Sequence, residues 1–250
     1  MESNSIIAQT HTRQCTHDQK LSCGNCRLNT ICMPVSLHVD DIDQLNQIIQ
    51  RGRPLNKGEY LYRANDTFTS VYAIRSGAVK ALTISDNGDE QVTGFYLPGE
   101  VVGLDGLANN NYTNSVIALE TSSICEIPFT RLEELSVQLP KLQRHFLQLM
   151  SREITHEQQI ISLLGKASAE ARIASLLLSI STRNSSRKLS ATAFLLPMSR
   201  TDIGNYLGLT IETVSRTFAR LQKTDVIAVD KKEVLIKDVQ GLQQLAKGAE

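Results

Sequence analysis

The longest regular hydrophobic pattern in the chain runs through residues 140–164. Apolar side chains recur there at spacings of three and four residues, which places them along one stripe of a helix. At 1.5 Å per residue this helix would extend roughly 37 Å, too long for one small core to bury. We therefore predict that a second copy of the chain covers the stripe, while packing within one domain is the alternative. The residues assigned to this homodimer contact are Phe146, Met150, Ile154, Glu157 and Ile161.

Glu157 is the carboxylate on this stripe. If two copies of the helix meet across a two-fold axis, each Glu157 approaches its mate, and two like charges in a partly desolvated seam oppose association. The neighbours Ile154 and Ile161 favour association. We predict a dimer close to its threshold of stability, and the alternative is that Glu157 stays solvated at the edge of the stripe.

Before the long helix, short β-rich runs are separated by regular turn signals. Asn and Asp at residues 65–66, Gly77, Asn87 with Gly88, and Pro98 with Gly99 supply the turns. Short strands with regular turns indicate an antiparallel roll or barrel. The predicted strands cover residues 59–63, 71–75, 78–84, 91–97, 116–119 and 123–127.

After the long helix, the sequence predicts a helix-turn-helix. Ser199 and Asp202 form a variant of the capping box that begins one helix, and Gly208 supplies the sharp turn. Thr210 is then the cap of a second helix. The apolar residues of this second helix, which would face the core, are Val214, Phe218 and Leu221.

A helix-turn-helix places the start of its second helix in the major groove of DNA. Glu212 and Arg216 are spaced i, i+4 and reach the same groove wall, where arginine reads guanine and a carboxylate accepts from cytosine. A surface Glu–Arg ion pair is the alternative. Residues 226–236 resemble a β-hairpin wing whose Lys231 and Lys232 could touch phosphate. The residues assigned to DNA are Glu212, Thr213, Ser215, Arg216 and Arg220.

Charge supports this assignment. The net charge of the 250-residue chain is zero, yet from residue 166 onward 13 Lys and Arg stand against 8 Asp and Glu, a net +5. A basic C-terminal part is what a nucleic-acid surface requires. No eighteen apolar residues follow one another and no secretory leader is visible, so we expect a cytoplasmic chain with no membrane partner.

Three of the five cysteines form a C-x2-C-x5-C run, Cys23, Cys26 and Cys32. Disulfides are rare in the cytoplasm, so metal or cluster ligation is the better interpretation. Zinc and iron–sulfur clusters both usually take four ligands, and Cys15 and Cys125 remain. We choose Cys125, because an apolar, strand-like run would hold it rigidly. A buried core cysteine is the alternative for Cys125, and an unused surface thiol is the alternative for Cys15. His17 and His38 flank the run as possible zinc ligands, and the spacing leaves the metal open.

Residues 72–77 (YAIRSG) and 98–103 (PGEVVG) are similar to the β-roll of the cyclic AMP receptor protein superfamily. In that superfamily an Arg-Ser-Ala motif after the second segment binds the cyclic phosphate. The corresponding residues here are Asn114, Ser115 and Val116. Because no guanidinium is present to hold a phosphate, we expect no cyclic nucleotide to bind.

With its cysteines, roll, long helix and the segment 208–216 (GLTIETVSR), nearly the whole chain resembles the oxygen-sensing FNR family of this superfamily. The resemblance implies a [4Fe-4S] cluster on Cys23, Cys26, Cys32 and Cys125, and a homodimer that binds palindromic DNA with TTGAT-like half-sites. Dioxygen is the signal. It would dismantle the cluster, and the dimer would then dissociate into monomers. Asn25 and Arg27 change the charge between the ligands, so oxygen sensitivity does not carry over quantitatively.

The resemblance also implies a contact with RNA polymerase through the turn at residues 85–91. A solvated hairpin tip is the alternative. The residues assigned to this contact are Asp86, Gly88 and Asp89.

The predicted fold class is therefore α+β, with a β-roll like that of cyclic nucleotide-binding domains, a long dimerisation helix and a winged helix-turn-helix. The predicted divisions are a cysteine segment at 1–37, a sensor roll at 38–135, the dimerisation helix at 136–165 and a DNA-binding domain at 166–250. The function implied is a global regulator that activates anaerobic genes and represses aerobic ones. The alternatives are a zinc-stabilised relative that senses another ligand and an iron–sulfur enzyme. No P-loop, Rossmann fingerprint or nucleophile elbow supports an enzyme.

Overall fold

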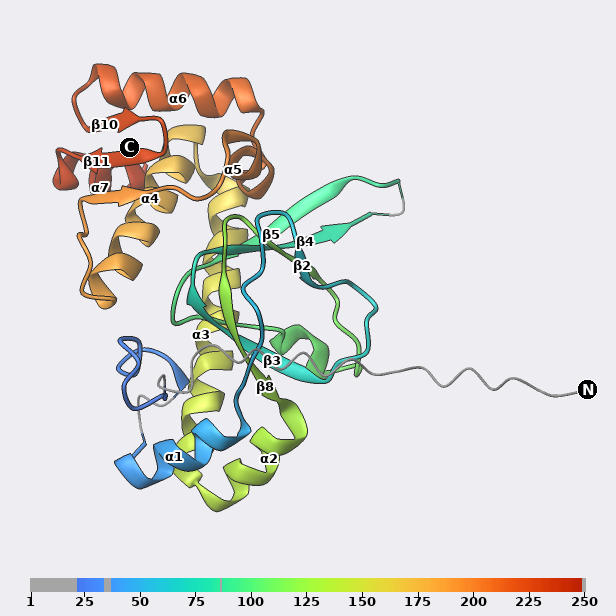
Figure 1. Ribbon diagram of the computed structural model, residues 1–250. Helices are drawn as coiled ribbons and strands as arrows, with labels where there is room; N and C mark the ends of the chain where they lie inside the picture. Colours follow the sequence, from blue (N-terminus) through green and yellow to red (C-terminus); the bar gives the residue numbers. More distant parts are fainter. Residues whose placement is uncertain (1–21, 34–36, 86, 249–250) are drawn as a thin grey trace, which may run out of the picture.

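The computed structural model describes residues 22–33, 37–85 and 87–248. One long helix, α3 (Pro140–Lys166), connects an N-terminal body of strands to a C-terminal body made mainly of helices (Figure 1). The predicted α+β fold, with a roll, a long helix and a winged helix-turn-helix, is confirmed. Pro140 occupies the first turn of α3, where its missing N–H leaves no hydrogen bond unmade.

The N-terminal body is a β-roll of two antiparallel four-stranded sheets, ordered β1-β8-β3-β6 and β2-β7-β4-β5. All six predicted strands are present, with ends within one residue of the predicted ends, and β1 and β6 are two further short strands. The strands are β1 (Gln50–Arg51), β2 (Tyr60–Tyr62), β3 (Ser70–Ser76), β4 (Val79–Ile84), β5 (Glu90–Tyr96), β6 (Val101–Val102), β7 (Ser115–Ala118) and β8 (Ser123–Pro128).

Helices cover one end of the roll. The sequence pattern did not separate α1 and α2 from their surroundings, because neither helix begins at a residue whose side chain caps it. Together with the first half of α3 they enclose a core of residues such as Leu45, Leu132 and Leu142. The helical elements of this body are α1 (Val39–Ile48), the 3-10 helix η2 (Leu104–Leu107) and α2 (Phe129–Gln138).

The two halves of α3 differ in what they contact. Phe146 is half-buried in the core of its own chain, with its ring centroid 6.1 Å from that of Phe129. Phe146 thus has an intramolecular partner as well, and its assignment to the dimer contact stays a prediction. Leu147, the next residue, is 58% exposed, and with Ile154 and Ile161 it forms an exposed stripe at an exact seven-residue spacing.

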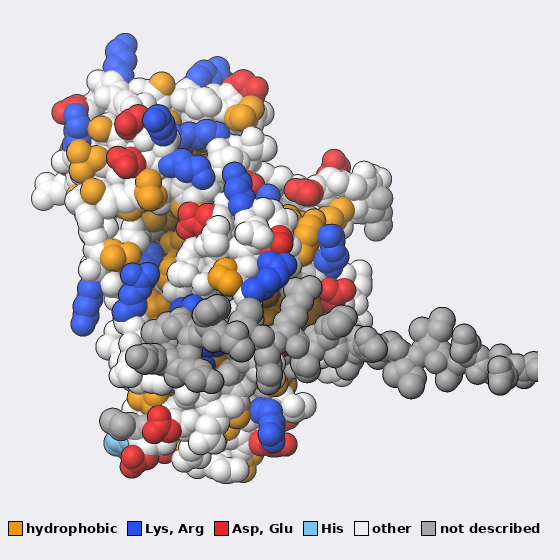
Figure 2. All heavy atoms as spheres, viewed as in Figure 1, with side chains coloured by type: hydrophobic (Ala, Val, Ile, Leu, Met, Phe, Trp, Pro, Cys, Tyr) orange, Lys and Arg blue, Asp and Glu red, His pale blue; other side chains and the backbone are white. Residues whose placement is uncertain are grey.

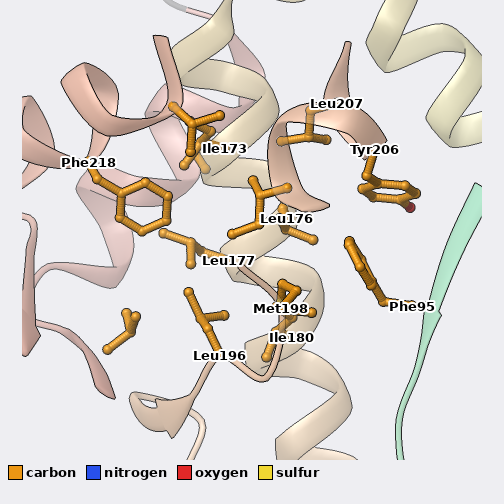
Figure 3. Packing of buried hydrophobic residues seen from close by; sticks show 14 of the residues in the cluster. Phe95, Ile173, Leu176, Leu177, Ile180, Leu196, Met198, Tyr206, Leu207 and Phe218 are labelled. Atoms are coloured by element: carbon orange, nitrogen blue, oxygen red, sulfur yellow. The ribbon is translucent and has the colours of Figure 1, made fainter. Parts of the chain in front are cut away.

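The C-terminal body contains the helix-turn-helix and a three-stranded wing. Its core is built on α4, where Ile173 and Leu177 are fully buried among Leu207, Phe218 and Leu196 (Figure 3). The elements are α4 (Ala169–Ser186), β9 (Ala193–Leu195), α5 (Arg200–Leu207), α6 (Ile211–Lys223), β10 (Ile227–Asp230), β11 (Glu233–Ile236) and α7 (Val239–Lys247). The predicted hairpin wing corresponds to β10 and β11, and β9 joins it as a third strand.

None of the helices in the described ranges combines the length and the apolar character that a membrane crossing requires.

Candidate cysteine site and DNA-reading surface

Residues 22–33, which we call the cysteine loop, fold as a series of tight turns. Cys26 donates its N–H to the carbonyl of Cys23 at 3.3 Å, and Cys32 donates to the carbonyl of Leu28 at 2.9 Å. The Asn29 amide closes the loop on the carbonyl of Gly24 at 3.1 Å. Because these bonds are local, the loop brings its three thiols together without a strand or long helix.

The four assigned cysteines meet at one cavity. Cys23, Cys26 and Cys32 line it from the loop, and Cys125 lines it from β8, where it pairs with Ala73 of β3. The cavity has an empty volume of about 530 Å³, part of it open to solvent. Apolar side chains make up much of the remaining wall, among them Leu28, Met33, Ile49, Ile74 and Ile127.

The other candidate ligands are Cys15, His17 and His38. Cys15 and His17 lie outside the described residues. His38 is not among the lining residues and instead lies with Nε2 at 2.6 Å from Nζ of Lys141. Within the described ranges, no group of three or more His, Cys, Asp or Glu side chains is placed to hold a metal ion as it stands.

The surroundings of the thiols favour their neutral form. Burial raises the pKa of Cys23 to about 11 and that of Cys32 to about 12, and it also raises the pKa of Cys125. Arg51 acts in the opposite direction on Cys23, because its Nη2 lies 3.8 Å from the thiol sulfur. A metal or cluster takes thiolates, so binding here would displace protons from the buried thiols.

The helix-turn-helix has the geometry that its sequence predicts. Ser199 Oγ accepts from the Asp202 N–H at 3.0 Å, and Asp202 Oδ2 accepts from the Ser199 N–H at 2.9 Å, which completes the capping box. Gly208 ends α5 with φ +62°, a left-handed conformation that favours glycine. Thr210 caps α6 by accepting from the N–H of Thr213 at 3.2 Å. Val214, Phe218 and Leu221 are buried, as predicted.

The residues assigned to base reading lie on the opposite side of α6. Glu212, Ser215 and Arg216 are exposed, and Thr213 is half-buried. The backbone N–H of Glu212 at the helix start, followed by the Thr210 hydroxyl, lowers the pKa of the Glu212 carboxyl. Among the residues that the structure describes, no ion pair joins Glu212 to Arg216, although the charge of Arg216 contributes to the lowered pKa of the Glu212 carboxyl. Base reading by Glu212 and Arg216 stays a prediction, and a surface pair stays its alternative.

Arg220 differs from the other residues assigned to DNA. Its guanidinium forms an ion pair with Glu170 at the start of α4, which links α6 to α4. In Figure 2, Lys and Arg side chains are spread over the upper part of the molecule, where the C-terminal body lies. The sequence did not predict the partner of Arg220, because the two residues belong to different helices.

The interior of the β-roll is filled by aromatic side chains. The rings of Tyr62 and Tyr112 stack with centroids 3.9 Å apart, and Tyr72 lies 5.6 Å from Tyr62. Where the superfamily has its phosphate-binding motif, Asn114 is hydrogen-bonded to Asp105. The expectation that the roll binds no cyclic nucleotide remains a prediction.

The turn assigned to RNA polymerase closes the β4–β5 hairpin. Asp86 lies outside the described residues. Gly88 donates to the carbonyl of Ser85 at 2.9 Å, and Ser85 donates to the carbonyl of Asp89 at 2.9 Å. Gly88 and Asp89 are exposed at the end of the hairpin.

This fold is that of a transcription regulator with a β-roll like that of cyclic nucleotide-binding domains and a C-terminal helix-turn-helix domain. The family models that match are the cyclic nucleotide-binding domain over residues 52–138 and the Crp-like helix-turn-helix domain over residues 171–245. The chain belongs to the FNR/Anr-type anaerobic transcription regulators of the CRP/FNR family, and it is not an enzyme.

Three similar proteins illustrate the relationship. The transcriptional activator protein FnrA of Stutzerimonas stutzeri is 52% identical over 227 residues, 91% of this chain and 93% of FnrA. The transcriptional activator protein anr of Pseudomonas aeruginosa is 53% identical over 226 residues, 90% of this chain and 93% of that protein. The structure of FixK2 from Bradyrhizobium japonicum has a TM-score of 0.74 at 28% identity and covers 81% of this chain and 100% of its own.

Proposed function

We propose that the chain is an oxygen-responsive regulator whose active form holds a [4Fe-4S] cluster on Cys23, Cys26, Cys32 and Cys125. The observation that carries this proposal is that four thiols from two distant parts of the chain line one largely apolar cavity. Four cysteine thiolates are the usual ligand set of such a cluster. When bound, the cluster would supply an iron–sulfur core that dioxygen can dismantle.

The side chains around the thiols support this assignment. Leu28, Ile49 and Ile74 limit the access of water to the sulfur atoms. Arg51, held by a 2.7 Å hydrogen bond to Asn46 Oδ1, places a positive charge beside Cys23 and would offset part of the negative charge of the thiolates.

We further propose that the regulator acts in the cytoplasm as a homodimer on palindromic DNA with TTGAT-like half-sites. The second half of α3 supports dimerisation, because Ile154 and Ile161 are 55% and 70% exposed on one stripe together with Glu157. Met150 and the exposed Leu147 extend this stripe toward the roll, and Phe146 stays part of the proposed contact. A two-fold dimer presents two copies of α6, one for each half-site.

On DNA, Glu212 and Arg216 would contact base edges, while Thr213, Ser215 and Arg220 complete the surface. The hairpin turn at 85–91, with Asp86, Gly88 and Asp89, would contact RNA polymerase. The dimer would activate anaerobic genes and repress aerobic ones. The domain divisions at 1–37, 38–135, 136–165 and 166–250 remain predictions and form part of this proposal.

Anaerobic purification tests the proposal directly. Absorption and Mössbauer spectra, sedimentation and palindrome binding are measured before and after exposure to air. We expect iron–sulfur signals, a dimer and specific DNA binding before air, and loss of all three afterwards. A colourless anaerobic protein that contains zinc and binds DNA equally well in air would refute the proposal and support a zinc-stabilised regulator.

A further inference from the structure

The β-roll and the DNA-reading domain share one apolar core. Phe95 of β5 lies edge-on to Tyr206 of α5, with ring centroids 5.0 Å apart, and the two side chains approach each other in Figure 3. Val92 and Leu97 belong to the same core as Ile173 and Ile180 of α4. Apolar contacts of this kind hold the two bodies together but do not fix their relative orientation. The orientation of the DNA-reading domain therefore depends on the polar contacts around this core.

The first of these polar contacts is made by Glu100, in the turn after β5. Its Oε1 accepts from Nε of Arg183 at 2.6 Å, and its Oε2 accepts from Nη2 of the same arginine, which makes the pair bidentate. Arg187, whose side chain is only 4% exposed, lies 3.7 Å from Oε1. Arg183 also donates to the carbonyl of Phe95 at 2.6 Å. One carboxylate of the roll thus holds two arginines of α4.

The second polar contact is made by Asn205 of α5 on β5. Strand β5 is the last strand of its sheet, so its outer N–H and C=O groups have no neighbouring strand within the roll. Asn205 Nδ2 donates to the carbonyl of Glu90 at 2.5 Å, and Asn205 Oδ1 accepts from the N–H of Val92. The side-chain amide therefore takes the place of a neighbouring strand. Beside it, Lys80 Nζ lies 2.7 Å from Asp202 Oδ1, with both side chains largely buried.

The cysteine loop rests on the turn that carries the first contact. Gly99 has φ +93°, and a Cβ atom at this position would lie 2.7 Å from Cδ1 of Ile31 and 3.9 Å from Cδ2 of Leu28. The glycine therefore allows the loop to sit against the turn. The next residue in the chain is Glu100. Ile31, the neighbour of Cys32, therefore packs against the glycine that directly precedes the carboxylate bound to α4.

We propose that Glu100 and Asn205 form a two-point clamp that positions the DNA-reading domain on the β-roll, and that the cysteine loop acts on the clamp through Gly99. Glu100 and Asn205 are positioning residues, since neither lies on the DNA-reading side of α6. In a dimer, the clamp sets the separation of the two α6 helices. It thereby selects the spacing between half-sites, independently of the strength of dimerisation along α3. The proposal rests on the proposed function.

Spacing preference tests the clamp. Full-length, cluster-loaded protein is titrated anaerobically with a palindrome of two TTGAT-like half-sites, with the same palindrome lengthened or shortened by one base pair, and with a single half-site. For Asn205→Ala we expect about a tenfold loss on the best palindrome, a much weaker preference among spacings, and single-half-site binding within about twofold. Glu100→Gln should act in the same direction. Glu120→Gln, an exposed glutamate of the roll, is the matched control and should behave like the unmodified protein.

Lys80→Met provides a second variant in case Asn205→Ala does not fold, because it breaks the contact with Asp202 from the roll without changing α5. It should weaken the spacing preference in the same way. Unchanged spacing preference in folded Glu100→Gln, Asn205→Ala and Lys80→Met proteins would overturn the clamp. Tighter palindrome binding by these variants would also overturn it, since the contacts would then hold an inactive orientation.

Ile31→Ala tests the link to the cysteine loop. This variant keeps all four thiols, so we expect the iron–sulfur absorption to remain while the spacing preference weakens. Because Ile31 is proposed to act through Glu100, the double variant with Glu100→Gln should be no worse than Glu100→Gln alone. Additive losses would overturn the link.

Small-angle scattering of the cluster-free chain separates failure of the clamp from failure of the proposed function, because it requires neither DNA nor a dimer. With the clamp, the unmodified chain is compact and Asn205→Ala is more extended. If the unmodified protein shows no spacing preference but this difference is present, the clamp stands and the palindrome function fails. Identical scattering curves for the two chains would overturn the clamp itself.

Discussion

Around the cysteine loop, four thiols line a cavity that is partly open to solvent, whereas α5 and α6 close on a filled core. Both helices of the reading motif begin at capped residues, Ser199 and Thr210. Beside the loop, by contrast, His145 is 1% exposed and neither of its ring nitrogens makes a hydrogen bond of ordinary geometry within the described residues. The reading motif is complete with protein atoms alone. The proposed cluster would complete the cysteine site, so the energetics of this site should change most when the cluster binds.

The largest effect should come from removing a thiol. Cys125→Ser is expected to abolish the anaerobic iron–sulfur absorption, as are serine substitutions at Cys23, Cys26 and Cys32, because four ligands are needed. Cys15→Ser is the matched control and should keep the absorption. Loss of the cluster in Cys15→Ser with retention in Cys125→Ser would show that the ligand assignment is wrong.

On the reading side, Glu212→Ala or Arg216→Ala should weaken palindrome binding tenfold or more, since a good base contact is worth about 1–3 kcal/mol. Binding to random DNA should change little. Lys231→Ala, in the turn of the wing, is a useful comparison, because loss of a phosphate contact lowers affinity for both DNAs alike. Equal losses on the two DNAs for Glu212→Ala and Arg216→Ala would mean that these residues only position the backbone.

Between the two regions, Glu157→Ala tests whether charge repulsion opposes dimerisation of α3. The cluster-free variant should dimerise and bind palindromes in air, at protein concentrations roughly tenfold lower than the unmodified chain requires, because a few kcal/mol suffice to shift such an equilibrium. Gln158→Ala, the exposed neighbour on the same helix, is the control. Sedimentation decides the matter, and a variant that associates as weakly as the unmodified protein would exclude the charge effect.

His145 gives a smaller effect on the cysteine side. The Gln148 side chain and the Cys32 backbone lie near the His145 ring, but neither contact has ordinary hydrogen-bond geometry. A buried polar group that is incompletely hydrogen-bonded costs about 1–3 kcal/mol, so His145→Leu should raise the free energy of unfolding of the cluster-free protein by about 1 kcal/mol. Urea denaturation of the two cluster-free proteins measures this. A decrease would show that the ring makes a stabilising contact in solution.

The smallest effect is expected at Glu153, where α3 passes the roll. Burial raises the pKa of its carboxyl, although the Tyr96 hydroxyl at 2.6 Å and His156 lower it, while Glu157 and Glu100 raise it. Because the folded pKa lies above the ordinary value of 4.5, ionisation opposes folding as the pH rises. Glu153→Gln should therefore melt at a slightly higher temperature at pH 7, and the difference should vanish below about pH 4. A difference independent of pH would contradict this origin.

The reading motif was predictable from sequence because its signals are local. The Ser199–Asp202 box, Gly208 and Thr210 all act within four residues, and each lies where the sequence placed it. For the cysteine site, sequence supplied a set of residue types and a choice of Cys125 from its strand-like context. The structure brings these four side chains to one cavity, while their role as ligands stays a prediction. The contacts of Glu100, Asn205 and Arg220 were not predictable, because their partners lie 50 to 115 residues away in the chain. The contact of Phe146 with Phe129 was not predictable either, because it joins two helices whose packing no local signal specifies.

The pairing of Asn205 with β5 also bears on solubility. If the DNA-reading domain swings away, the N–H of Val92 and the carbonyl of Glu90 become an open strand edge in a sheet. Such an edge can pair with the same edge of another molecule, which is a common route to aggregation. While the domain is docked, the clamp would prevent this pairing between strand edges of two molecules. Precipitation of clamp variants should therefore rise steeply with protein concentration.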